Sequence, residues 1–452
     1  MTASPGLPPG PPLPRTVQMA LMLRYWPRFI TACRRRYGDV FTVRMAGLGP
    51  LIYLADPADI KTVFAGDPAI YQAGQANSVL SGLLGETSVL VIDGDVHRDR
   101  RRLMMAPFAR EAVGRQHELI AQIAADNIAA WPVGRDFPVA PKMGQITLEV
   151  ILRTVIGASD PDRLAALRAI MPRLLSLGPW SSLAIARPQL QHRLPWRSLR
   201  RRIEAADALL YAEIAERRAD PRLAERTDTL AMLVRAADED GRQMSDVELR
   251  DQLITLLAAG HDTTATGLSW ALERLTRHPD VLADAVAAAD RGDDEYLDAL
   301  AKETLRIRPV VYDVGRVLTA DVEVAGYRLP AGTTVVPCIG LVHACPAVYD
   351  HPERFDPRRM IGATLSPTTW LPFGGGNRRC LGANLAMAEM RIVLAEVLRR
   401  VELAATAAAG ERQRVRGVVL TPHRGARIQV SRMRKTAHNE HFASSEHKHD
   451  MA

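Results

Sequence analysis

A glycine-rich loop that carries one cysteine and leads into a long helical pattern constrains this chain more than any other feature. The loop reads Phe373-Gly374-Gly375-Gly376-Asn377-Arg378-Arg379-Cys380-Leu381-Gly382. A plain core position would not need these glycines, because each loses extra conformational entropy on folding. The start of the following helix, which we expect over residues 383–401, favours a thiolate through its dipole. The loop therefore predicts that Cys380 binds a metal or cofactor, with Phe373 shielding the sulfur.

Composition narrows the class of protein. The chain has 452 residues and 47% hydrophobic content, enough for a large core. Its four cysteines show neither zinc-type spacing nor a disulfide framework, which favours a reducing cytoplasm. The net charge of +7 comes almost entirely from arginines interspersed with carboxylates, so we expect no nucleic acid partner. The apolar stretch 17–30 is too short and too charged to span a bilayer, although it could lie on a membrane surface.

Hydrophobic periodicity predicts a mainly α fold with small β-sheets (α+β). We expect a proline-rich segment over residues 1–14, a single domain over 15–431, and a disordered polar tail over 432–452. Strands are predicted at 41–45, 51–54 and within 321–337 with a turn at 330–332, and a terminal hairpin over 416–430 is predicted to turn near 422–425. Helices are predicted at 57–64, 118–131, 145–156, 160–177, 199–218 and 246–278, with an excursion between helices at 178–197. The helix over 246–278 is too long to be peripheral, so it should cross the core.

Two further motifs lie on predicted helices. Glu303 and Arg306 are three residues apart and can pair on one helical face. Within the long helix, the run 258–264 reads Ala-Ala-Gly-His-Asp-Thr-Thr, in which Gly260 costs about 1 kcal/mol against alanine. That glycine indicates either a notch for helix packing or a helix locally opened for a ligand, with the Thr263 hydroxyl facing the gap. Both interpretations stay open at this point.

The cysteine loop carries a family resemblance. Phe373, Gly376, Arg378, Cys380 and Gly382 match Phe-x-x-Gly-x-Arg-x-Cys-x-Gly, which resembles the haem-binding signature of the cytochrome P450 family. The similarity covers roughly residues 30–430 and points to an unfused bacterial haem-thiolate monooxygenase. It implies the family fold, a triangular prism with haem b between a long central helix and the helix after the cysteine loop. It also implies that Cys380 is the axial thiolate of the haem iron, the metal ligand whose electron donation favours O–O cleavage.

The same resemblance implies roles for other residues of the chain. His97, Arg101, Arg316 and Arg378 would neutralise the haem propionates, and Phe373, Gly376 and Gly382 would complete the cofactor site. Asp262 and Thr263 would deliver protons during oxygen activation, while His261 would point away from the iron. Glu303, Arg306 and Arg354 would form a structural network around the cysteine loop. The substrate pocket would include Ala258, Ala259, Val311, Tyr312 and Val314, with Tyr312 and Asp313 able to fix one polar group.

These roles imply a monooxygenase that inserts one oxygen atom of O2 into a hydrophobic small molecule. The pocket segments are largely apolar, which suits a lipid, sterol, terpenoid or polyketide. No flavin or iron–sulfur module is fused, so a ferredoxin and an NAD(P)H-dependent ferredoxin reductase would supply electrons. Arg98, Arg100, Arg102 and Arg379 offer a docking face for an acidic ferredoxin.

Two other functions share the haem. One is a peroxide-driven peroxygenase, and the other is a non-enzymatic haem-dependent binding or sensing protein, against which Asp262 and Thr263 argue. We expect a cytoplasmic monomer with room for peripheral membrane contact. Nothing in the sequence identifies the molecule that is oxidised.

Overall fold

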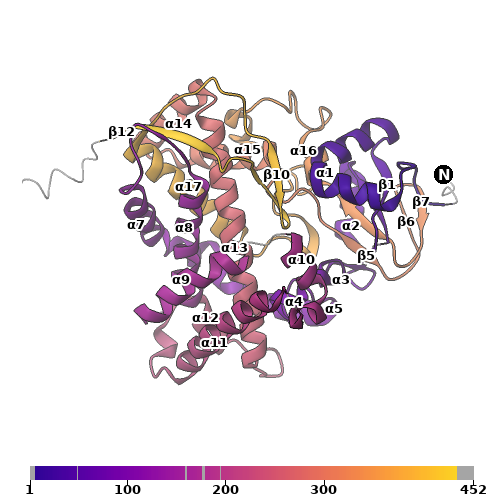
Figure 1. The fold of residues 1–452 in the computed structure, drawn as a ribbon, viewed down its shortest axis with the longest axis horizontal. Coiled ribbons are helices and arrows are strands. Elements are labelled where there is room, and N and C mark those ends of the chain that lie inside the picture. The colour runs from indigo at the N-terminus through magenta and orange to yellow at the C-terminus, as the bar shows by residue number, and fades with distance from the viewer. Residues whose placement is uncertain (1–5, 48, 158–159, 176–178, 194, 435–452) are drawn as a thin grey trace, which may run out of the picture.

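The computed structural model describes residues 6–47, 49–157, 160–175, 179–193 and 195–434, and it is mainly helical with small sheets (Figure 1). The helices are α1 (Arg15–Tyr37), α2 (Pro57–Ala65), α3 (Ala73–Asn77), α4 (Ser81–Leu84), α5 (Gly94–Met105), α6 (Arg110–Gly114), α7 (His117–Ile128), α8 (Ala140–Ile151), α9 (Pro161–Leu175), α10 (Pro179–Ala186), α11 (Arg197–Ala219), α12 (Thr229–Arg235), α13 (Asp246–Leu275), α14 (Pro279–Arg291), α15 (Asp294–Ile307), α16 (Ile339–His343) and α17 (Ala383–Arg400). The strands are β1 (Val40–Arg44), β2 (Pro50–Leu54), β3 (Tyr71–Gln72), β4 (Asp136–Pro138), β5 (Arg316–Leu318), β6 (Val322–Val324), β7 (Tyr327–Leu329), β8 (Thr334–Pro337), β9 (Val401–Leu403), β10 (Gln413–Arg416), β11 (Val419–Pro422) and β12 (Arg427–Met433).

Helix α13 crosses the helical part of the molecule, as its predicted length requires (Figure 1). It begins with a capping box. The Ser245 side chain accepts a hydrogen bond from the Glu248 backbone N–H, and the Glu248 side chain accepts one from the Ser245 backbone N–H. Most of its residues are buried, and Trp270 is fully enclosed. Because α8 and α17 both pack against α13, the helix after the cysteine loop is fixed to the central helix.

The main sheet lies beside α1, to one side of the helical part (Figure 1). Its strand order is β1-β2-β8-β5-β3, with β2 and β8 parallel and the other neighbours antiparallel. The described part of the proline-rich segment packs on this sheet. The Thr42 hydroxyl donates to the Pro8 carbonyl at 2.6 Å, and the Thr42 N–H donates to the Pro9 carbonyl at 2.9 Å. These residues are therefore joined to the domain that we expected to begin at residue 15.

Two predicted features near the chain's middle and end differ from the structure, and a third is confirmed. The terminal hairpin pairs β10 with β11 and turns at Gly417-Val418, whereas β12 pairs with β4 and β9. The strands and the turn predicted within 321–337 are confirmed, since β6, β7 and β8 lie there and the Thr333 N–H donates to the Pro330 carbonyl at 3.2 Å. Strands β6 and β7 pair as a hairpin that turns at Ala325-Gly326, and β8 joins the main sheet. The described part of the 178–197 excursion contains α10 and a 3₁₀ turn over Pro188–His192. Strand pairing was the weak point because period-two alternation does not say which strand lies alongside which. The tail beyond Arg434 lies outside the described residues.

The side chains of Tyr312 and Asp313 belong to the interior between α1 and the sheet, which corrects their assignment to a substrate pocket. Tyr312 is buried, and its ring meets Trp26 edge to face with centroids 5.9 Å apart. The Asp313 carboxylate accepts a hydrogen bond from the Trp26 indole N–H at 3.0 Å and another from the Tyr53 hydroxyl. Through these two hydrogen bonds the Asp313 carboxyl links α1 to the sheet.

Asp313 should make stability depend on pH. Burial raises the pKa of its carboxyl from about 3.8 to about 7, against the lowering effect of Tyr53 and Trp26. Because the pKa is higher in the folded state, the protonated carboxyl contributes its full stability to the fold below about pH 4, and this stability is lost as the pH rises through 7. We expect Asp313→Asn to remove this loss, about 2–4 kcal/mol, and to be more stable than the parent at pH 8. Urea unfolding of both proteins from pH 5 to pH 8 measures it, and parallel curves would contradict it.

Candidate active site

Cys380 lies in a short connection between a 3₁₀ turn (Gly376–Arg378) and α17. Its backbone N–H donates to the Phe373 carbonyl at 2.8 Å, and the Gly382 N–H donates to its sulfur. Desolvation raises the pKa of the thiol, while that hydrogen bond and the charges of Arg101 and Arg379 lower it. The residue is nevertheless accessible, unlike Cys33, Cys338 and Cys345, which are buried. The sulfur is thus surrounded by protein and still reachable, as a cofactor ligand must be.

The glycines of the loop serve its packing against α2. Gly376 has φ of +67°, and a Cβ there would lie 2.3 Å from the Phe64 carbonyl oxygen. A Cβ on Gly375 would lie 2.3 Å from the Phe64 ring. Glycine at these two positions therefore lets the loop pack closely against Phe64 of α2. Phe373 packs edge to face against Trp370, with centroids 5.8 Å apart, at the start of the loop.

Four basic side chains meet beside the cysteine loop. His97 is buried on α5, and its pKa falls to about 4 because of burial, then the charges of Arg378 and Arg101. Arg316 is buried on β5, and its pKa falls to about 10 because of burial and then Arg378. His97 and Arg101 lie one turn apart on α5, and the fold brings Arg316 and Arg378 to them from distant parts of the chain. At neutral pH the cluster holds three guanidinium charges and a neutral imidazole.

The cluster has too little negative charge of its own. Arg378 forms an ion pair with Asp93 and donates to the Val89 carbonyl at 3.1 Å. Arg316 donates to the backbone carbonyls of Gly315 at 2.9 Å and Gly375 at 3.5 Å and lies over the Phe64 ring, without a carboxylate partner among the described residues. Within the described part of the chain, Arg101 has no hydrogen bond or ion pair. Desolvated cations of this kind favour an anionic partner. A cofactor that combines a thiolate-binding metal with two carboxylates, as haem does, fits this set of residues.

The segment 258–263 of α13 is accessible, although it lies between two buried stretches of the helix. Ala259 is exposed and Ala258, Asp262 and Thr263 are half-buried, whereas Leu257 and Thr264 are buried. The helix runs through this segment without a break, and the Thr263 hydroxyl donates to the Ala259 carbonyl at 2.5 Å. A Cβ on Gly260 would lie 2.7 Å from Ile151 Cδ1. Of the two interpretations of Gly260, the packing notch is therefore the correct one.

His261 faces α8. Its Nδ1 lies 3.0 Å from Thr147 Oγ1, and the Thr147 hydroxyl is also 3.1 Å from the His261 carbonyl oxygen. Its Nε2 lies 3.7 Å from Asp262 Oδ1, so the ring borders the carboxylate without a hydrogen bond to it. Burial lowers the pKa of His261, which keeps the ring neutral at pH 7. The side chain is used for helix packing, in keeping with its predicted orientation away from the cofactor.

The Glu303–Arg306 pair is fully buried and holds the segment that precedes the cysteine loop. Arg306 forms two hydrogen bonds to Glu303, at 2.7 and 2.8 Å, and its guanidinium also donates to the carbonyls of His343, Pro352 and Arg354. Arg354 contributes only that carbonyl, since its side chain is exposed. The second guanidinium beside Glu303 is that of Arg359, at 3.3 Å. The prediction of Arg354 as the third charged member is wrong, because the turn at residues 351–354 directs its side chain to solvent.

His343 is a second member of this network that sequence reasoning missed. Its Nε2 accepts the Leu371 backbone N–H at 2.9 Å, two residues before Phe373, while its carbonyl accepts from Arg306 at 2.9 Å. Burial lowers its pKa to about 3, so it is a neutral acceptor. The apolar run before it suggested burial, but no spacing linked it to the loop. Arg359 was missed for a similar reason, because nothing in the sequence distinguishes it from its neighbour Arg358.

The remaining predicted residues are two pocket valines and the arginines of the proposed docking face. Val311 is half-buried, and Val314 packs under the main sheet. Among the proposed docking arginines, Arg379 is exposed, and Arg98 and Arg102 are exposed but paired, with Asp95 at 2.9 Å and with Glu239. Arg100 cannot contribute to a docking face, because it is buried and forms an ion pair with Glu248 of α13. Its charge serves the packing of α5 on the central helix.

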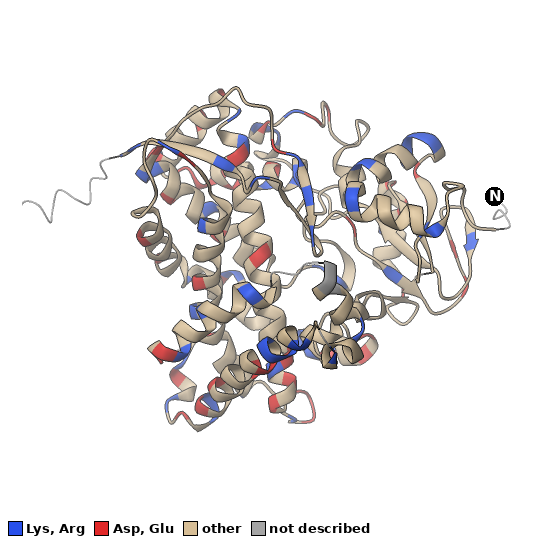
Figure 2. Ribbon diagram, viewed as in Figure 1, with Lys and Arg blue, Asp and Glu red and all other residues tan. Residues whose placement is uncertain are grey.

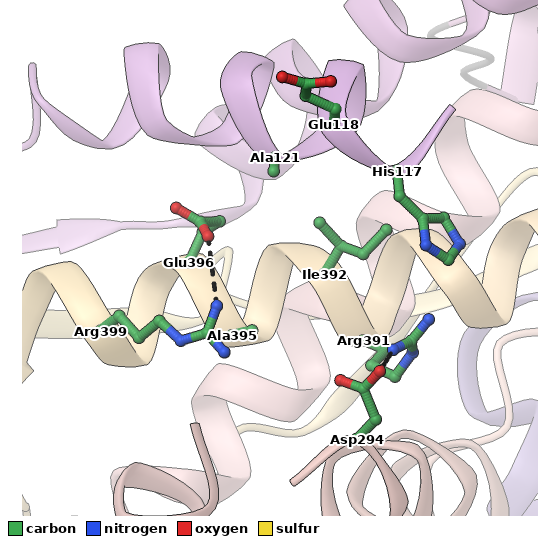
Figure 3. Close-up of a pocket in the computed structure, with 9 residues that line it drawn as sticks. All are labelled: His117, Glu118, Ala121, Asp294, Arg391, Ile392, Ala395, Glu396 and Arg399. Atoms are coloured by element: carbon green, nitrogen blue, oxygen red, sulfur yellow. Dashed lines mark hydrogen bonds and ion pairs between the residues drawn. The ribbon is translucent and has the colours of Figure 1, made fainter. Parts of the chain in front are cut away.

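A surface pocket lies between α7 and α17, away from these residues (Figure 3). Its charged side chains are largely matched within the protein: Arg391 pairs with Asp294, and Arg399 lies 3.6 Å from Glu396. No cluster of His, Cys, Asp or Glu side chains that could hold a metal ion occurs among the described residues. Cys380 and its surroundings are therefore the better candidate.

Comparisons with known proteins identify the class. The sequence model described as Cytochrome P450 matches residues 8–430. The solved structure titled "Retinoic acid bound cyanobacterial CYP120A1" has a TM-score of 0.82 at 23% identity, covering 95% of this chain and all of that one. The haem domain of cytochrome P450DA gives 0.80 at 23% identity, covering 96% and 99%. The chain belongs to the cytochrome P450 family, the haem-thiolate monooxygenases, and has their fold.

Mycobacterial relatives are much more similar in sequence. The chain is 71% identical over 435 residues to a protein named cytochrome P450 135B1 in Mycobacterium tuberculosis and Mycobacterium bovis, covering 95% of this chain and 92% of the relative. It is 39% identical to Mycobacterium tuberculosis cytochrome P450 138, covering 94% and 96%. Within the described residues no helix is long and apolar enough to cross a membrane.

Proposed function

We propose that this protein oxidises a hydrophobic small molecule with O2, using Cys380 as the axial ligand of its haem iron. The observation that carries the proposal is one accessible, desolvated thiol beside three guanidiniums that share a single carboxylate. Arg101, Arg316 and Arg378 would hold the haem propionates, with neutral His97 as a further donor. When bound, the haem supplies the chemistry of O2 activation.

The chain's own contribution is positioning and proton supply. The Asp262 carboxylate is partly accessible and can take protons from solvent, and the Thr263 hydroxyl can rotate from the Ala259 carbonyl to pass one on. The Gly382 N–H and the charges of Arg101 and Arg379 favour the thiolate form of Cys380. Ala258 and Ala259 present only methyl groups on this face of α13, which suits an apolar substrate.

Reconstitution tests the reaction class. The purified haem protein is mixed with a surrogate ferredoxin, its reductase, NADPH and a panel of lipids, sterols, terpenoids and polyketides chosen by spectral binding. We expect a product that carries one oxygen atom from labelled O2. Product formation with hydrogen peroxide but not with the reductase pair would instead support a peroxygenase. Spectral binding without any product from either oxidant would support a binding protein.

Asp262 and Thr263 can be tested together. We expect Asp262→Asn and Thr263→Ala each to lower product formation about 10²-fold, the usual scale for losing a proton-transfer group. Much of the reducing power should then appear as hydrogen peroxide, because oxygen is still reduced but not used. His261→Gln is the matched control, since its side chain packs against Thr147 of α8. Unchanged coupling of NADPH use to product in both variants would contradict the roles.

Electron delivery should depend on the exposed arginines near Cys380. We propose that a separate acidic ferredoxin docks at Arg379 and Arg98 in the reducing cytoplasm, where the unpaired cysteines fit. Arg379→Glu combined with Arg98→Glu should slow reduction about tenfold at low salt and flatten its salt dependence. Arg24→Glu combined with Arg28→Glu on α1 is the control with the same change in net charge. Equal rates for all three proteins would rule out this face.

A further inference from the structure

Helix α1 has a charge distribution unlike that of the other surface helices. The chain has no acidic residue before Asp39, and α1 carries six arginines. Only Arg34 is paired, with Asp39 at 2.6 Å. The others form no ion pair with any described residue: they are Arg15, Arg24, Arg28, Arg35 and Arg36. All five are exposed. Figure 2 shows these basic residues along α1.

Arginines on other surface helices commonly have acidic partners one turn away. Arg153 lies 2.5 Å from Glu149, Arg200 lies 2.6 Å from Glu204, and Arg400 lies 2.7 Å from Glu396. Such pairs neutralise a solvated helix surface. Helix α1 has no residue that could play this part, so its positive charge faces solvent uncompensated.

Large apolar side chains are exposed among these arginines. Leu23 is 65% exposed, Tyr25 is 47% exposed and Val17 is 42% exposed. Packing does not explain them, because α1 buries its other stripe, including Met22 and Ile30, against the sheet. The outer surface of α1 is therefore both cationic and apolar.

The hairpin of β10 and β11 extends this surface. Strand β10 packs against α1, with Val415 turned toward the same hydrophobic cluster as Met22. Strand alternation leaves Arg414 exposed, and it forms no ion pair with a described residue, whereas the charge of Arg416 acts on His261 of α13, on the side of the site. Arg412 is exposed and unpaired in the same way, and Val418 at the turn is 55% exposed. Figure 2 shows the basic residues of β10 near those of α1.

We propose that α1 and the β10–β11 hairpin form a docking surface for an anionic phospholipid bilayer. Arginine guanidiniums pair with lipid phosphates and are attracted by the negative potential of the membrane surface. Leu23 and Tyr25 enter the boundary between head groups and acyl chains, where an apolar side chain or an amphipathic ring is most stable. The surface combines the two signals that reversible membrane binding requires.

A bilayer suits this surface better than a protein or nucleic acid partner. An electron carrier must approach Cys380, whereas α1 packs against β1 and β10. The site also connects to the hairpin, since the Trp270 indole on α13 donates to the Leu420 carbonyl at 2.8 Å and the Leu420 N–H donates to Val310 at 2.8 Å. A docked hairpin would thus bring a membrane-dissolved substrate near the predicted pocket. That consequence rests on the proposed function, but the docking does not.

Vesicle sedimentation of the full-length haem protein tests the docking. Vesicles contain phosphatidylcholine alone or mixed with phosphatidylglycerol, at low and high salt. We expect binding only to the mixed vesicles and loss of binding at high salt. Arg24→Gln, Arg28→Gln and Arg35→Gln together should lower the partition coefficient about 100-fold, since each arginine near the surface contributes about fivefold. Leu23→Ser should weaken binding without changing its salt dependence.

The control carries the same charge change elsewhere: Arg153→Gln, Arg200→Gln and Arg400→Gln. It should bind vesicles within about threefold of the parent, because these arginines already have carboxylate partners. Far-ultraviolet circular dichroism confirms that each variant is folded. Absence of binding to anionic vesicles overturns the proposal, as does equal loss in the two triple variants. Binding to DNA but not to vesicles overturns it in favour of nucleic acid. No readout depends on turnover, so failure of the proposed reaction leaves this test intact.

Discussion

Replacing Cys380 by alanine is expected to abolish the red-shifted Soret band of the reduced carbon monoxide complex. That band requires a thiolate ligand on the haem iron, and Cys380 is the accessible cysteine of the described residues. The change also removes the hydrogen bond that the Gly382 N–H donates to the sulfur. We therefore expect a folded protein with at most weak haem binding and no monooxygenase activity.

Cys33→Ala is the matched control. Cys33 is buried between α1 and the sheet, where desolvation raises the pKa of its thiol to about 11 and makes it a packing residue. This variant should keep the red-shifted band while losing some stability, on the order of 1–2 kcal/mol. Carbon monoxide difference spectra of the two variants at equal haem content make the comparison. A red-shifted band that persists in Cys380→Ala would refute the ligand assignment.

The sequence was sufficient where a motif is local in the chain. The loop at 373–382 and the segment 258–264 were found because the residues of each motif are adjacent in the chain. The structure places the loop directly before α17 and the segment on α13, as expected. Helix existence followed from periodicity, and α13 ends three residues before the predicted His278. These features depend on short-range constraints that spacing alone can express.

The sequence was insufficient where a residue's role depends on distant partners. Asp313 adjoins pocket residues in the chain, yet Trp26 and Tyr53 bind its carboxylate between α1 and the sheet. Arg100 lies between exposed arginines, yet Glu248 on α13 binds it in the interior. A burial pattern predicts neither contact, because a long side chain can turn either toward solvent or inward from the same helix position.

Replacing Arg306 by alanine should cost about 3–5 kcal/mol of unfolding free energy, since the buried Glu303 loses its two-bond partner and keeps only Arg359 as a charged neighbour. The same change frees three carbonyls, including that of His343, whose ring accepts the Leu371 N–H just before the cysteine loop. We therefore expect a smaller fraction of haem-loaded protein as well as a lower denaturation midpoint. Urea unfolding and haem content per chain measure the two effects.

Arg359 and Arg354 provide a sharper comparison, because only their position relative to Glu303 distinguishes them. Arg359→Ala removes a guanidinium 3.3 Å from Glu303 and should cost about 2 kcal/mol, less than the buried pair because Arg359 is partly accessible. Arg354→Ala keeps the carbonyl that Arg306 uses, so its effect should stay within about 0.5 kcal/mol. Combining Arg359→Ala with Glu303→Gln should give a cost below the sum of the single changes, since both remove one interaction. A cost for Arg354→Ala as large as that for Arg359→Ala would return Arg354 to the network, and strict additivity of the Arg359 and Glu303 changes would exclude Arg359.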